Sequence, residues 1–210
     1  MKRLIFSVLV FFSAGFANAQ TIADVFIKMP DEMIVQLEEA WRKDLIDLYK
    51  SGKTASLENT MQGRSVLKKL TDNYLLLETT ERSTLEMKLL PLVNNTFIVC
   101  LISTVYAPVA DSRTAFYTTE WKQISTKELF TPITGDWFQK EDTDTTSVKY
   151  QETKSLIYFD LIKYSLNEND NTLTAAYTFP EFLNEEEREK LLPFLKTEPK
   201  VYEWKLSRFE

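Results

Sequence analysis

Apolar residues recur with the spacing of a helix early in the chain and alternate with the spacing of strands later. An amphipathic helix is predicted where apolar side chains return every three or four residues with charges between them, at Ile34, Leu37, Trp41, Leu45 and Leu48. Pro30 suits its first turn and Gly52 suits its end. A second, shorter helix is predicted over residues 65–70.

Strands are predicted from Asn73 onward. In residues 85–89, Leu or Met alternates with Glu or Lys, which predicts a strand with one buried face. Residues 96–106 are apolar on both alternating faces as far as Ile102, so this strand is expected to be central and covered on two sides. The Asn-Asn pair at 94 and 95 predicts the hairpin turn between these strands. Residues 116–124 predict a further strand.

A second hairpin is predicted near the C-terminus. Residues 126–150 include an acidic and threonine-rich run and are expected to form a linker or long loop. Residues 156–166 and 172–179 then read as two strands around a polar turn.

A helix and a closing strand complete the pattern. Asn184 is a predicted N-cap, with Glu187 completing a capping box, and Pro193 is expected to break the helix. Tyr202, Trp204 and Leu206 alternate in the predicted closing strand.

This order of elements predicts an α+β protein. N-terminal helices are expected to pack on an antiparallel meander sheet, with a later hairpin, helix and strand forming a second lobe or extending the same sheet. The predicted divisions are a signal peptide (1–19), a helix-plus-sheet module (20–125), a linker or long loop (126–150) and a second α+β lobe (151–210). The last part is either separate from residues 20–125 or continuous with them.

The first nineteen residues have the order of a secretory signal peptide. Lys2 and Arg3 precede an apolar run that is too short to cross a bilayer, and a small-x-small triplet ends at Ala19. Cleavage is therefore predicted between Ala19 and Gln20. The mature protein is expected in the periplasm of a Gram-negative cell or outside it, without stable membrane insertion.

Composition excludes several classes of function. The chain carries 25 basic and 31 acidic residues, a net charge of −6, which makes nucleic acid a poor partner. It has no histidine, so imidazole-based catalysis and histidine metal sites are excluded. Four glycines form no phosphate-binding loop, and the single cysteine, Cys100, forms no internal disulfide. No metal or cofactor is expected.

Four segments carry a resemblance to a known family. They are residues 23–31, 44–47, 84–91 and 116–121, with the sequences ADVFIKMPD, DLID, TLEMKLLP and FYTTEW. The chain resembles the uncharacterised secreted family named domain of unknown function 3256, found in Bacteroides-type Gram-negative bacteria. The resemblance implies export and an envelope setting. It assigns no catalytic or binding role to any residue.

Carboxylates are the catalytic chemistry that remains without histidine, because paired Asp or Glu can cleave glycosidic bonds. The candidates are Asp160, Glu120 and Asp136. Asp160 is expected on a strand face with Tyr158 and Tyr164, partly buried and with a raised pKa, as a general acid requires. The alternative is that Asp160 has a structural partner. A Ser-x-x-Lys match at Ser65 is the other candidate, with an ordinary helix surface as its alternative.

Aromatic residues are numerous in the second half. Trp137, Tyr158, Tyr164 and Trp204 are the candidate binding residues if one face of the sheet is uncovered. If both faces are covered, these side chains are core.

The sequence therefore favours an exported envelope protein that binds a protein, a peptide or a glycan without catalysis. A small carboxylate-dependent glycoside hydrolase is one alternative, and a structural or envelope-assembly factor is another. The oligomeric state is left open.

Overall fold

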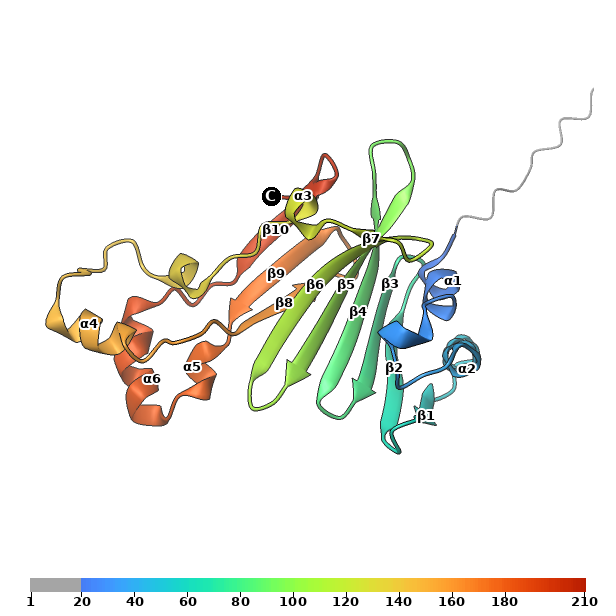
Figure 1. Ribbon diagram of the computed structural model, residues 1–210, viewed down its shortest axis with the longest axis horizontal. Coiled ribbons are helices and arrows are strands. Elements are labelled where there is room, and N and C mark those ends of the chain that lie inside the picture. The colour runs from blue at the N-terminus through green and yellow to red at the C-terminus, as the bar shows by residue number, and fades with distance from the viewer. Residues whose placement is uncertain (1–19) are drawn as a thin grey trace, which may run out of the picture.

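A seven-stranded antiparallel sheet forms the middle of the molecule, and strands adjacent in sequence are neighbours in space (Figure 1). The computed structural model describes residues 20–210, so the predicted signal peptide lies outside the described residues. The sheet consists of β1 (Ser56–Glu58), β2 (Arg64–Leu70), β3 (Tyr74–Thr80), β4 (Ser83–Pro91), β5 (Phe97–Tyr106), β6 (Ala110–Thr118) and β7 (Gln123–Ile124). As predicted, β5 is central, and it is buried on both faces from Ile98 to Ile102.

Three short helices cover one face of this sheet. They are α1 (Ile22–Ile27), η1 (Asp31–Met33) and α2 (Glu39–Lys50). Phe26 and Leu45 from the helices share a core with Leu77, Leu85 and Met87 from the sheet. This burial supplies the main stabilisation of the helices, because helices this short are marginal in isolation.

The predicted N-terminal helix is shorter than its apolar spacing suggested. It begins at Glu39, because the preceding residues form η1 and a loop that the buried Arg42 side chain holds. The guanidinium donates hydrogen bonds to the carbonyl oxygens of Ile27 and Leu37. The predicted end is confirmed, since Gly52 has a φ of 69° that favours glycine.

A four-stranded antiparallel sheet covers the opposite face. Its strands are β8 (Ile162–Leu166), β9 (Thr172–Tyr177), β10 (Lys200–Lys205) and β11 (Arg208–Phe209), in the order β11-β10-β9-β8. Cys100 and Phe116 of the larger sheet share a core with Tyr164, Leu173 and Tyr202 of the smaller one. The α+β class and the antiparallel meander are therefore confirmed.

Short helices lie beside the ends of the two sheets. They are α3 (Thr126–Leu129), η2 (Gly135–Phe138), α4 (Val148–Lys154), α5 (Phe179–Phe182), α6 (Glu185–Leu191) and η3 (Leu192–Phe194). Figure 1 shows α4, α5 and α6 together, beyond the strands. Asn184 caps α6 as predicted, accepting a hydrogen bond from the Glu187 amide. No helix within residues 20–210 is long and apolar enough to span a membrane.

The prediction that β4 has only one buried face is wrong. Glu86 and Lys88 point away from the helices, yet both are buried because the second sheet packs over them. The Lys88 ammonium donates to the carbonyl oxygens of Asn167 and Glu168, at 2.5 and 3.3 Å. Backbone groups of the turn between β8 and β9 thus replace the water that the Lys88 charge loses.

Three side chains of the larger sheet cap the free edge of β8. The amide of Ile162 donates to the Asp111 carboxylate at 3.3 Å, and the amide of Tyr164 donates to the Ser112 hydroxyl at 3.1 Å. The amide of Leu166 donates to the Glu86 carboxylate at 2.9 Å. These β8 edge caps satisfy groups that would otherwise form an open sheet edge.

Other sequence predictions are also corrected by the structure. Residues 65–70 lie in β2 and not in a helix. The strand expected over residues 116–124 is interrupted by a turn in which Trp121 has a φ of 64°. Leu206 lies in the turn between β10 and β11 and not in a strand. Asp160 lies in the loop before β8, where its side chain is exposed.

Candidate functional site

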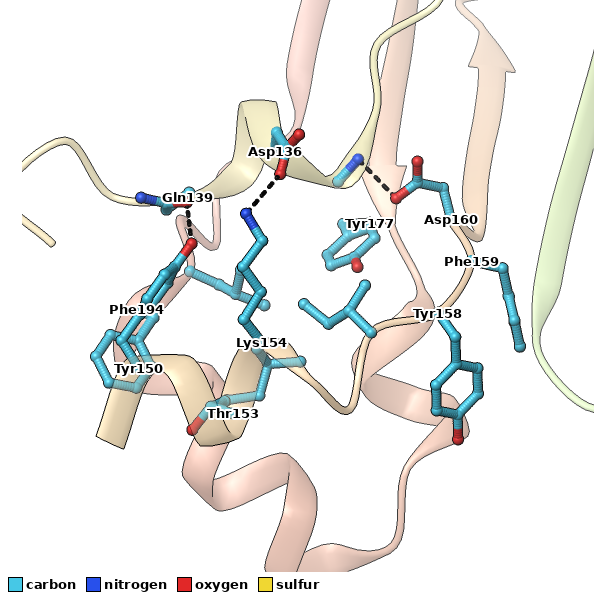
Figure 2. Close-up of a pocket in the computed structure, with 14 residues that line it drawn as sticks. Asp136, Gln139, Tyr150, Thr153, Lys154, Tyr158, Phe159, Asp160, Tyr177 and Phe194 are labelled. Atoms are coloured by element: carbon cyan, nitrogen blue, oxygen red, sulfur yellow. Dashed lines mark hydrogen bonds and ion pairs between the residues drawn. The ribbon is translucent and has the colours of Figure 1, made fainter. Parts of the chain in front are cut away.

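A cavity of about 250 Å³ lies at the end of the smaller sheet, and we call it the aromatic cleft. Its lining comes from η2 and Gln139, from α4 and the loop that follows it, from Tyr177 of β9, and from Leu191, Phe194 and Leu195. Figure 2 shows these segments surrounding the cavity, with Tyr177 at its centre. The cleft therefore depends on four segments that are far apart in sequence.

Tyr177 is held rigidly by stacking on both faces. Its ring lies 5.3 Å from Phe138 at an interplanar angle of 12° and 6.0 Å from Phe179 at 22°. The hydroxyl oxygen is buried and has no hydrogen-bond partner among the described residues. Burial raises the pKa of Tyr177, with a further contribution from the Asp160 charge, so the hydroxyl keeps its proton.

Gly135 closes one side of the cleft by close backbone approach. A Cβ at this position would lie 2.6 Å from Oδ1 of Asp160 and 2.8 Å from the Tyr177 hydroxyl. Only glycine leaves room for these two groups, and its amide donates a 2.8 Å hydrogen bond to Asp160. The carboxylate and the tyrosine hydroxyl are thereby placed next to each other.

Charged groups form the rim. The Lys154 ammonium lies 3.8 Å from the Asp136 carboxylate, and both side chains are about half or more exposed, at 52% and 81%. Figure 2 shows Lys154 reaching across the cleft toward Asp136. Because this pair is solvated, it contributes little to stability and is free to rearrange.

The structure brings two of the three predicted carboxylates together. Asp136 and Asp160 line the aromatic cleft, whereas Glu120 lies in the turn after β6 and does not line it. Asp160 is exposed and not partly buried as expected. Hydrogen bonds from the hydroxyls of Thr119 and Thr118 lower the pKa of Glu120, which keeps it ionised.

The predicted aromatic residues have different surroundings. Tyr158 lines the cleft and is 68% exposed. The Trp137 ring is covered by the ammonium groups of Lys196 and Lys200, at 5.1 and 5.8 Å. Tyr164 and Trp204 belong to the core between the sheets.

The Ser-x-x-Lys pair is not assembled as a catalytic pair. Ser65 is fully buried, and its hydroxyl donates to the carbonyl oxygen of Thr79 at 2.8 Å. The Lys68 ammonium instead pairs with Glu78 at 3.3 Å on the protein surface. The two side chains therefore have different partners, and the Ser65 hydroxyl contacts the Asn59 amide and the Thr79 carbonyl in place of a base.

Sequence reasoning missed Thr153 and Lys154 as members of a site and did not single out Tyr177 among the aromatic residues of the second half. Tyr177 ends an ordinary alternating strand, and the two α4 residues lie next to the stretch predicted as a linker. No local signal identifies them, because the cleft exists only after α4, η2 and β9 meet. Within residues 20–210, no group of three or more acidic or cysteine side chains could hold a metal ion.

These features define a two-sheet α+β protein with an aromatic cleft beside its smaller sheet. Residues 15–209 match the family described as "Protein of unknown function (DUF3256)", and the chain belongs to that family. The family resemblance found in the sequence is thus confirmed.

A solved structure has the same fold over most of its length. It is described as "Structure of a domain of an uncharacterized protein from Porphyromonas gingivalis W83". It is 31% identical, has a TM-score of 0.80, and the match covers 90% of this chain and 96% of that one. No curated protein matches the chain.

Proposed function

We propose that this is a non-catalytic binding protein of the bacterial envelope whose aromatic cleft takes an apolar side chain of a polypeptide partner. The observation that carries the proposal is the Tyr177 hydroxyl, which is buried at the cleft without a hydrogen-bond partner. Buried polar groups in folded proteins are nearly always paired, so an unpaired one beside a cavity indicates a missing ligand atom.

The hydrogen bonds already made by the polar side chains of the cleft favour a polypeptide ligand over a glycan. The Thr153 hydroxyl already donates to the carbonyl of Lys149, and the Tyr150 hydroxyl already donates to Gln139 at 2.5 Å. Ile157, Leu191 of α6 and Leu195, which follows η3, supply apolar surface. A sugar ring would find polar partners mainly at the charged rim, whereas an apolar side chain with one nearby amide would match the apolar lining and the Tyr177 hydroxyl.

The envelope setting is the second part of the proposal. It is supported by the signal-peptide pattern of residues 1–19 and by the acidic composition, which disfavours anionic lipid and nucleic acid. A partner located in the periplasm or outside the cell is therefore proposed.

The test uses peptides selected from a random dodecapeptide library displayed on phage against the purified protein. Ile157→Trp should fill part of the cleft, and the affinity of the selected peptides, measured by fluorescence anisotropy, should fall at least tenfold. Val148→Trp is the matched control, because Val148 lies on the exposed side of α4 and should leave affinity unchanged. Failure to select any peptide, or equal binding by both variants, would contradict the proposal.

A glycoside hydrolase is the second candidate, and it is favoured by the presence of Asp136 and Asp160 in one cleft. Both carboxylates, however, have a hydrogen-bond donor or a cation beside them, and neither is withdrawn from water. The test is hydrolysis of a panel of nitrophenyl glycosides by the unaltered protein and by Asp160→Asn. Turnover that Asp160→Asn abolishes would support the hydrolase over the binding protein.

A further inference from the structure

The outer edge of β6 is only partly covered. β7 pairs with β6 through Phe116 and Tyr117 alone, so no strand of residues 20–210 pairs with the outer edge from Asp111 to Ala115. β6 is otherwise a full-length strand that pairs with β5 over nine residues. The larger sheet therefore has a short open edge beside the smaller sheet, where Figure 1 shows β6 next to β8.

The hydrogen bonds on either side establish which backbone groups point outward. The amide of Thr118 donates to the carbonyl of Lys122 across this edge, and the carbonyl of Ala110 accepts from the Thr178 hydroxyl. Because orientation alternates along a strand, the N–H and C=O groups of Ser112 and Thr114 also point outward. Two residues thus present four backbone groups in the geometry of a strand edge.

A groove of about 380 Å³ runs along this open edge, and we call it the edge groove. One wall is the β6 segment 111–114, and the other includes Phe130, Pro132 and Ile162. Thr114 lines the groove, and its hydroxyl oxygen is buried and has no partner among the described residues. The edge groove and the aromatic cleft are thus each lined by a residue whose buried hydroxyl has no partner.

We propose that the edge groove binds an extended segment of the partner polypeptide as an additional strand beside β6. β6 has one open edge, and strand addition pairs such an edge with one extended peptide, so the occupant is a single peptide segment. Asp160 lines both cavities, so the segment continues past it into the aromatic cleft. The exposed carboxylate at this junction favours a basic residue in the partner, flanked by apolar residues. This last step rests on the proposed function of the cleft.

Strand addition depends on backbone groups, so the test removes one of them. Thr114→Pro deletes an outward N–H, and proline is tolerated at an edge where that group faces solvent. The phage-selected dodecapeptides should then bind at least tenfold more weakly. Glu58→Pro is the matched control, because Glu58 lies on the outer edge of β1, away from the groove, and should leave affinity unchanged.

A second measurement uses the unaltered protein and does not depend on the folding of a variant. Saturating selected peptide should slow hydrogen exchange of the Ser112 and Thr114 amides at least tenfold, while the Glu58 amide is unaffected. Unchanged exchange at both amides would overturn the inference. Weaker binding by Ile157→Trp alone would leave the cleft proposal standing and remove the edge groove. Weaker binding by Thr114→Pro alone would support the edge groove and remove the proposal that the aromatic cleft binds the peptide.

Discussion

Removal of the Glu86 carboxylate is expected to weaken the docking of the two sheets. In Glu86→Ala, the buried amide of Leu166 loses its acceptor at 2.9 Å, and the Tyr74 hydroxyl loses a longer contact at 3.3 Å. A lost hydrogen bond to a charged group and a small new cavity together cost about 3 kcal/mol. For a chain of this size, that corresponds to a fall in Tm of roughly 6–12 °C.

Glu86→Gln removes the charge of the carboxylate but keeps a hydrogen-bond acceptor, so it tests the two contributions separately. Glutamine keeps an acceptor for Leu166, so its stability should lie within about 1 kcal/mol of the unaltered protein. Burial raises the pKa of Glu86, despite the opposing hydrogen bond from Leu166. The unfolded chain therefore ionises first as pH rises above about 4.3, and the protein loses stability until the folded carboxyl also ionises. Glu86→Gln should escape this loss and gain stability relative to the unaltered protein as pH rises above about 4.3.

The assay is equilibrium unfolding in urea, followed by tryptophan fluorescence at several pH values. Glu86→Ala should lower the midpoint with little change in slope, because the surface exposed on unfolding is nearly the same. The reasoning would be refuted if Glu86→Ala were as stable as the unaltered protein. It would also be refuted if Glu86→Gln were equally destabilised or showed no pH-dependent gain.

Three further predictions concern a glycine of the cleft, the cysteine and the N-terminus. Gly135→Ala should cost about 1–3 kcal/mol in urea unfolding because its Cβ would meet two polar atoms within 3 Å, whereas Gly63→Ala, with its nearest neighbour at 3.5 Å, should be tolerated. Burial raises the pKa of the Cys100 thiol, so it should react with a thiol reagent such as Ellman's only after unfolding. Purified envelope protein should begin at Gln20 by N-terminal sequencing, and retention of residue 1 would contradict the signal-peptide prediction.

Local signals in the sequence predicted local features well. Gly52 ends α2 because its φ is positive, and Asn95 turns the chain after β4 for the same reason. The apolar run of β5 indicated a strand covered on both sides, since no polar residue interrupts it before Ser103. Each of these features depends on residues within a few positions of one another.

Residues 65–70 were mispredicted because of a β-bulge. The register of β2 against β3 shifts between Leu67 and Lys69, which places one extra residue in the strand. Leu67 and Leu70 consequently face the same core at a spacing of three. That spacing is typical of a helix, so the pattern could not separate the two structures.

The neighbouring edges of the two sheets differ in how far their backbone groups are capped, and this difference bears on the proposed binding. Side chains of the larger sheet cap three amides of β8, which protects that edge from pairing with another chain. Within residues 20–210, no such caps protect the open edge of β6 at Ser112 and Thr114, although it lies beside the capped edge. An uncovered edge is a liability for aggregation, but this edge lies in a groove whose other wall includes Phe130, Pro132 and Ile162. Recognition of an extended peptide by strand addition requires an open edge of this kind, and a peptide bound there would lie beside the aromatic cleft.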